Sequence, residues 1–205
     1  MKQPRILFID TETGGTNPQK HDLLSVGLAV WENGNIIARK EIPVQGRPER
    51  CTEEALAINR IDLEAHNRKA LSRKEALSEI IRFIEQHFEE RPVTVAGHNV
   101  AFDLNFLRAL FEEFGEDMSH YLAHRTIDTA SILQLLALLE GSASNLQEVA
   151  SSSRAFAIYH IDIPAKERHT ALGDAMATAR LFSKILEKLK ERHQPDPAPA
   201  ASSHA

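Results

Sequence analysis

The stretch ILFIDTETGG, residues 6–15, decides the fold because it joins a strand-like apolar run to two closely spaced carboxylates. Four apolar residues at 6–9 lead into Asp10, and Glu12 follows two positions later. In an extended chain, side chains at positions i and i+2 point to the same side, so Asp10 and Glu12 must project together from the end of a strand. Open α/β sheets carry their functional sites at the C-terminal ends of their strands, which is where Asp10 and Glu12 lie. Taken alone, however, an Asp-x-Glu pair is also typical of a polar turn that leaves a strand.

The rest of the chain alternates strand-like and helix-like patterns. We expect strands at residues 5–10, 23–31, 35–42, 92–99 and 126–130, with Asn33-Gly34 as a two-residue hairpin turn. Helical spacing and capping residues predict helices at residues 52–58, 72–90, 100–114, 131–139, 145–150 and 170–192. These patterns predict one α/β domain over residues 1–193, with a central five-stranded mixed sheet, three early antiparallel strands and helices on both sides. The Pro-, Ala- and Ser-rich residues 194–205 are expected to be a disordered tail.

The composition is that of an ordinary water-soluble globular protein. Hydrophobic residues make up 42% of the chain and charged residues 26%, and no apolar run approaches the roughly 18 residues of a membrane span. The start of the chain, MKQPRILFID, lacks the features of a signal peptide, and a single cysteine, Cys51, suits a reducing compartment. We therefore expect a cytoplasmic protein with no membrane partner. The net charge of −5 disfavours a general coat for nucleic acid but leaves a local binding groove open.

A further acidic residue lies in AGHNVAFDLNFL, residues 96–107. If Asn99 caps a helix here, the apolar side of that helix carries Phe102, Phe106, Leu107, Leu110, Phe111 and Phe114. Asp103 lies on the same side of the helix. A buried carboxylate is costly without a partner, so Asp103 needs a hydrogen-bond donor, a basic residue or a metal ion. The alternative is a first-turn acid that the free helix amides and the helix dipole satisfy.

The third cluster is RHTALGDAMATARLF, residues 168–182. His169 is expected at the entrance of the last helix, and Asp174, five residues later, one turn inside it. Alone, this pair would be interpreted as a capping residue and a solvated acid.

Together, the three clusters resemble the DEDDh exonucleases, the ribonuclease-H-like family that includes ribonuclease T and the proofreading subunit of bacterial DNA polymerase III. The motifs stand here as DTETGG (10–15), HNVAFDLNFL (98–107) and HTALGD (169–174), in the family's order. A sister group has Tyr four residues before the final acid, whereas this chain has Thr170 there and His169 one position earlier. The resemblance covers residues 5–190 and implies a ribonuclease H-like fold with metal-dependent 3′→5′ exonuclease activity.

The resemblance also implies a role for each acidic residue. Asp10 would bridge two divalent ions, Glu12 and Asp174 would hold the ion on the nucleophile side, and Asp103 would act on the other. A cluster of acids needs cations, because two carboxylates 4 Å apart repel by roughly 4 kcal/mol even at an effective dielectric of about 20. Divalent ions remove this repulsion. All-oxygen ligands favour Mg²⁺, with Mn²⁺ as a substitute. His169 would be the general base that takes a proton from the attacking water, and the products would be nucleoside 5′-monophosphates.

Substrate contacts follow from the same resemblance. Backbone groups of Thr13 and Gly14 would face the terminal nucleotide, and His98 and Asn99 the phosphate or sugar. Two apolar residues complete the expected contacts: Ile58 as a wall for the end base, or else as part of the core, and Phe102 as a stacking platform. Residues 39–74 hold nine Lys or Arg and six Asp or Glu, a local charge of +3 that suits a phosphate backbone but equally a solvated face.

The expected partner is the 3′ end of single-stranded DNA or RNA, and the choice between the two stays open. Whether the chain forms a homodimer or associates with a polymerase also stays open. The competing interpretations are a non-catalytic binding module of the same fold, such as a polymerase-associated subunit, and an endonuclease of the same broad fold. The complete set of acidic residues argues against a pure binding module, which has no need to concentrate repelling carboxylates.

Overall fold

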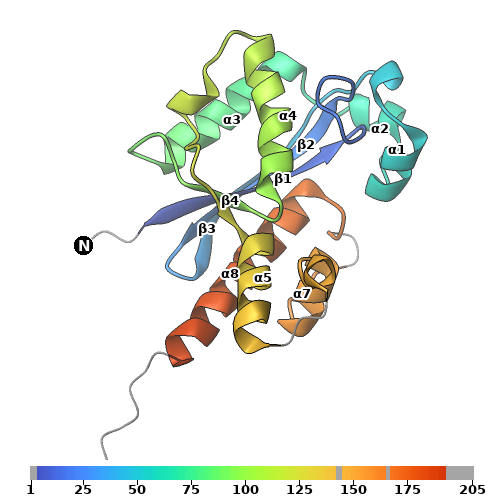
Figure 1. Ribbon diagram of the computed structural model, residues 1–205. Helices are drawn as coiled ribbons and strands as arrows, with labels where there is room; N and C mark the ends of the chain where they lie inside the picture. Colours follow the sequence, from blue (N-terminus) through green and yellow to red (C-terminus); the bar gives the residue numbers. More distant parts are fainter. Residues whose placement is uncertain (1–3, 142–144, 165–166, 193–205) are drawn as a thin grey trace, which may run out of the picture.

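A computed structural model describes residues 4–141, 145–164 and 167–192, and it contains the predicted mixed sheet (Figure 1). The strands are β1 (Arg5–Thr13), β2 (Leu23–Glu32), β3 (Asn35–Pro43), β4 (Val95–Gly97) and β5 (Ile127–Asp128). Their order is β3-β2-β1-β4-β5; β1, β2 and β3 are antiparallel neighbours, whereas β4 pairs in parallel with β1 and β5. The prediction of a five-stranded mixed sheet is therefore confirmed. The expected tail at 194–205 lies outside the described residues.

The β2–β3 hairpin forms where its turn residues predict it. Asn33 and Gly34 both have positive φ angles, of 50° and 86°, as a two-residue hairpin turn requires. Every residue of β2 except the last is buried, so this strand lies inside the fold.

Eight helices surround the sheet in the described parts of the chain. They are α1 (Glu53–Asn59), α2 (Leu63–Asn67), α3 (Arg73–His87), α4 (Val100–Glu113), α5 (Thr129–Glu140), α6 (Leu146–Val149), α7 (Ser152–Ile158) and α8 (Ala171–Arg192). Thr52 caps α1 by accepting from Ala55 N, and a complete capping box of Ser72 and Glu75 starts α3. The sequence patterns did not predict α2, α7 and the short 3-10 helices Pro48–Arg50 and Met118–His120. No helix in the described residues is long and apolar enough to span a bilayer.

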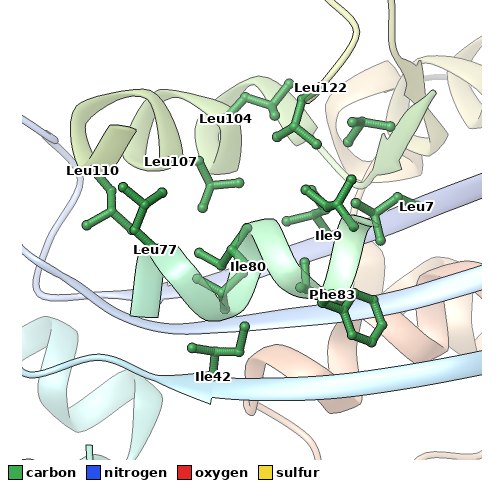
Figure 2. Packing of buried hydrophobic residues seen from close by; sticks show 14 of the residues in the cluster. Leu7, Ile9, Ile42, Leu77, Ile80, Phe83, Leu104, Leu107, Leu110 and Leu122 are labelled. Atoms are coloured by element: carbon green, nitrogen blue, oxygen red, sulfur yellow. The ribbon is translucent and has the colours of Figure 1, made fainter. Parts of the chain in front are cut away.

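The helices form a layer on each face of the sheet, α3 and α4 on one and α8 with α5 and α7 on the other (Figure 1). Leu7 and Ile9 of β1 pack with α3 and α4, together with Ile80 and Leu107 (Figure 2). The alternate β1 residues Ile6 and Phe8 pack against α8. Because side chains of a strand alternate between faces, this pattern decides which layer each polar residue at the end of β1 meets.

Candidate active site

The last residues of β1 send carboxylates to one face of the sheet and a hydroxyl to the other. Asp10 and Glu12 continue the alternation of Phe8, so they lie on the face that α8 covers. Thr11 continues the alternation of Ile9 and lies on the α4 face. Its hydroxyl donates a hydrogen bond of 2.7 Å to Oδ1 of Asp103 in α4. The end of this strand therefore has side chains that face each of the two helix layers.

Asp174 reaches the β1 carboxylates because β2 has a glycine at the point of closest approach. Gly27 pairs directly with Asp10 in the sheet, and a Cβ on Gly27 would lie 2.1 Å from the backbone of Ala171, the first residue of α8. The first turn of α8 therefore rests on the sheet itself, and Asp174 belongs to that turn. Carboxylate oxygens of Asp10, Glu12 and Asp174 lie within 4.8 Å of one another.

Asp103 is buried in the first turn of α4, as its place on the apolar side of the helix predicts. Asn99 stands at the start of this helix, as its place in the sequence suggests. Asn99 occupies the N-cap position in a left-handed conformation, with φ 59°, and its side chain makes no capping bond. Asp128, at the end of β5, instead accepts from the backbone N–H groups of Asn99 and Val100 at 3.2 and 3.1 Å. The parallel pairing of β4 with β5 brings the Asp128 carboxylate to this helix end, a contact that local sequence does not encode.

Burial and mutual repulsion make the ionised acids expensive. Burial, followed by the charges of Asp103, Asp174 and Glu12, raises the pKa of Asp10 well above its usual range. Burial and then the Asp174 charge raise the pKa of Glu12 to about 8. Burial raises the pKa of Asp103 to about 7, against the lowering effect of the Thr11 hydrogen bond. Near neutral pH these acids cannot all ionise unless a cation joins them.

The donor set fits divalent metal ions. All candidate ligand atoms are carboxylate oxygens, which suit hard cations. Oδ1 of Asp174 is buried and has no hydrogen-bond partner in the described parts of the chain, so it can serve as a ligand atom. The other oxygen of Asp174 accepts a hydrogen bond from Arg168, a residue that the sequence patterns did not single out.

His169 lies where the third motif predicts it, two residues before α8 begins. It has a left-handed backbone, with φ 64°, in a turn that folds back on the helix. Gly173 permits this turn, because a Cβ at Gly173 would lie 1.9 Å from the carbonyl oxygen of Glu167. The His169 side chain is half-buried at the entrance of α8.

Helix α1 borders the end of β1 on the expected substrate side. Asn59 Nδ2 donates a 2.9 Å hydrogen bond to the carbonyl oxygen of Thr13, which ties α1 to the strand. Ile58, its neighbour, is 58% exposed, so the alternative that Ile58 belongs to the core is wrong. Gly14 has protein partners for both backbone polar groups: its N–H donates to the Asp22 carbonyl, and its own carbonyl accepts from Thr52 N. Close packing explains the glycine, because a Cβ there would lie 2.6 Å from the Arg50 carbonyl oxygen.

His98 and Phe102 are held by neighbouring protein groups. The two ring nitrogens of His98 lie 3.0 Å from the Thr129 hydroxyl and 2.6 Å from the Ala150 carbonyl oxygen. Burial lowers the pKa of His98, which favours the neutral ring; Nε2–H donates to Ala150, while the Thr129 hydroxyl beside Nδ1 donates to the Gly97 carbonyl oxygen at 3.0 Å. Phe102 is half-buried, with its ring 5.1 Å from that of Phe106.

Comparison with known proteins agrees with the fold and the acidic cluster. The exonuclease family model RNase_T matches residues 7–182. The chain therefore belongs to the RNase T exonuclease family, a family of hydrolases that act on nucleic-acid 3′ ends and whose acidic sites imply a divalent metal.

Individual relatives support this assignment. Ribonuclease T of Vibrio campbellii is 33% identical over 197 residues, which cover 90% of this chain and 86% of the relative. Ribonuclease T of Shewanella denitrificans is 31% identical over 196 residues, with 90% and 81% covered. Among solved structures, E. coli exonuclease I in complex with a dT13 oligonucleotide superimposes with a TM-score of 0.75 at 17% identity. That match covers 93% of this chain but only 42% of exonuclease I, and it shows a shared fold.

Proposed function

We propose that the chain is a metal-dependent 3′→5′ exonuclease that releases nucleoside 5′-monophosphates from single-stranded nucleic acid, with two Mg²⁺ or Mn²⁺ ions per site. One observation carries the proposal: carboxylate oxygens of Asp10, Glu12 and Asp174 converge within 4.8 Å in a chain of the RNase T family. The raised pKa values of Asp10 and Glu12 support a cation at this position, since a bound cation restores the ionised forms.

The residues divide the chemistry of phosphodiester hydrolysis between them. Two divalent ions at such a site stabilise charge on both the attacking and the leaving oxygen of an in-line displacement. Asp10, on the central strand, would hold both ions, Glu12 and Asp174 would hold the ion on the nucleophile side, and Asp103 would act on the other. Thr11 keeps Asp103 in place through its hydroxyl. His169 takes the proton of the attacking water.

The residues around the cluster are assigned to the terminal nucleotide. Exposed Ile58 supplies an apolar wall on α1, and the Thr13–Gly14 backbone lies beside it. Asn99 is exposed and its side chain makes no cap, so its amide is available to a phosphate or sugar. We assign His98 and Phe102 to the same terminal nucleotide, His98 through the ring edge that its two hydrogen bonds leave open.

A single-stranded substrate is the favoured choice. Structures of E. coli exonuclease I contain dT13 and dA16 oligonucleotides, whereas the relatives with higher identity are named ribonuclease T. We therefore propose single-stranded 3′ ends as the substrate class and leave DNA and RNA as alternatives for the assay. The lone Cys51 further supports a reducing compartment such as the cytoplasm.

End-labelled single-stranded DNA and RNA of the same sequence, each incubated with Mg²⁺ or Mn²⁺, test the proposal at nucleotide resolution. We expect a ladder that shortens from the 3′ end, mononucleotide products and no cleavage after chelation. Asp10→Asn should abolish the ladder in both substrates. Internal fragments would favour an endonuclease. Binding of the DNA and RNA oligonucleotides without any product would favour a non-catalytic module.

A further inference from the structure

Arg168 is a basic residue in direct contact with the acidic cluster. Its Nη1 donates to Oδ2 of Asp174, and its Nη2 donates to the Ser153 hydroxyl at 2.9 Å. The guanidinium carbon lies 5.4 Å from the centre of the Phe156 ring, within the range of a cation–π interaction. Helix α7 thus contacts one part of the guanidinium, while Nη1 of the same guanidinium pairs with the first turn of α8.

The charge of Arg168 extends to the rest of the cluster. Carboxylate oxygens of Asp10, Glu12 and Asp174 lie within 4.8 Å of one another, so a guanidinium paired with Asp174 is also close to the other two acids. In the metal-free protein the guanidinium therefore does part of what a divalent ion would do, because it places positive charge among carboxylates that repel one another.

The two oxygens of Asp174 have different surroundings. Oδ2 is paired with Arg168, whereas Oδ1 is buried and finds no hydrogen-bond partner among the residues that the structure describes. A divalent ion that binds Asp174 therefore approaches a carboxylate that is already paired with a guanidinium. Since both cations are positive, binding of the ion must weaken the pair with Arg168 or be weakened by it.

We propose that Arg168 is a positioning residue that holds Asp174 in the metal-free enzyme and competes with the divalent ion for that carboxylate. The proposal rests on the metal site of the proposed function. Ser153 and Phe156 retain Arg168 beside the site when the divalent ion binds Asp174 in its place. The exchange of arginine for metal ion at Asp174 is therefore reversible. Arg168 then lowers the affinity for metal and stabilises the metal-free fold.

Calorimetric titration of chelator-stripped protein with Mn²⁺ tests this exchange directly. We expect Arg168→Gln to bind Mn²⁺ roughly three- to tenfold more tightly than the wild type, because a partly buried, charge-assisted pair no longer competes. Arg168→Lys keeps the charge but loses the planar fork, so its affinity should fall between the two. Arg154→Gln is the matched control: Arg154 also lies on the α7 side but pairs with Glu148, and its loss should leave the affinity unchanged.

Melting temperatures give a second readout. Arg168→Gln should melt below the wild type without metal, and the difference should shrink at saturating Mn²⁺. A residue that only supported the site's structure would lower metal affinity when removed, which is the opposite sign.

Unchanged or weaker Mn²⁺ binding by folded Arg168→Gln would overturn the inference, while a wild type that binds metal and degrades 3′ ends would leave the proposed function intact. If circular dichroism shows that Arg168→Gln does not fold, Arg168→Lys decides, and wild-type or weaker affinity would overturn the inference. No Mn²⁺ binding by any folded variant or by the wild type would overturn the metal site and the inference together.

Discussion

At the scale of single residues, the alternation of side chains along β1 organises the site. Asp10 and Glu12 face α8, and Thr11 between them faces α4, where its hydroxyl holds Asp103. One strand thus connects acids from both helix layers. Their raised pKa values follow from this crowding, because burial and like charges both disfavour the ionised forms.

The Glu12→Gln variant tests the electrostatic cost in the absence of metal. With a folded-state pKa of about 8 against a usual value of 4.5, Glu12 binds a proton in the native state that the unfolded chain has released. Its contribution to stability is therefore complete below about pH 4.5 and is lost as the pH rises towards 8. With chelator present, we expect the melting temperature of the wild type to fall more steeply than that of Glu12→Gln over this interval.

Saturating Mn²⁺ is the control, because a bound cation favours the ionised acids and should remove the advantage of Glu12→Gln at pH 8. Parallel melting curves for the two proteins in chelator would contradict the raised pKa.

The proposed base, His169, can be separated from the metal ligands. His169→Ala should keep the Mn²⁺ affinity of the wild type but lower kcat by roughly 10²–10⁴-fold, the usual contribution of a general base. His124→Ala, which removes an exposed imidazole, serves as the control for unspecific loss. A near-normal kcat for His169→Ala, measured by mononucleotide release, would remove the base role.

At the scale of elements, two close contacts place the helices that carry the acids. Gly27 lets the first turn of α8 rest on β2 directly opposite Asp10. Asp128 accepts from the first amides of α4 and also from Ala130 N at 2.9 Å, so one carboxylate caps both α4 and α5. The contacts of Gly27 with α8 and of Asp128 with α4 join segments that are distant in the sequence.

Asp128→Ala should therefore affect both stability and activity. Losing two caps should lower the free energy of unfolding by about 2–3 kcal/mol, and fraying of α4 should loosen Asp103 and reduce exonuclease activity. Asp62→Ala is the matched control, because Asp62 caps α2 alone through Ala65 N and should cost about 1 kcal/mol with little loss of activity. Denaturant unfolding and the end-label assay measure the two effects, and equal activity losses would contradict this division.

At the scale of the whole molecule, the two faces of the sheet support different parts of the site. On the α8 face, Phe182 packs against Phe8 and Trp31 with ring centres 5.5 and 5.4 Å apart. On the other face, Phe83 of α3 lies in the large cluster that also contains Leu7 and Ile9 (Figure 2). Helix α8 carries Asp174, whereas α3 carries none of the proposed site residues.

Truncating one aromatic residue on each face separates general stability from support of the site. Phe182→Ala and Phe83→Ala should each cost about 3–5 kcal/mol of unfolding free energy, since both rings are nearly fully buried. Only Phe182→Ala should also weaken Mn²⁺ binding, because it loosens the helix that positions Asp174. Calorimetry at low temperature, where both variants stay folded, measures the difference; equal loss of affinity would argue against separate roles for the two faces.

Local patterns predicted the elements that depend on local physics. Apolar runs, the Asn33-Gly34 turn and the capping box of Ser72 and Glu75 predicted the first three strands, their hairpin and the start of α3, all of which the structure contains. Asn99 stands at the N-cap of α4 as expected, but the capping hydrogen bonds are accepted by Asp128, an acid at the end of another strand. Helix α7 was missed, although it holds Arg168 through the Ser153 hydroxyl.

By itself, the sequence determined the periodicities that build the sheet and its helices, and the motifs that mark Asp10, Glu12, Asp103, His169 and Asp174 as a set. Both depend on the chain's local geometry and on residue identity. Only the tertiary structure decided which oxygens meet, which acids become hard to ionise, and which arginine pairs with Asp174. Those properties depend on distances and burial between segments up to 164 positions apart, from Asp10 to Asp174, and the packing of both helix layers on one strand sets them.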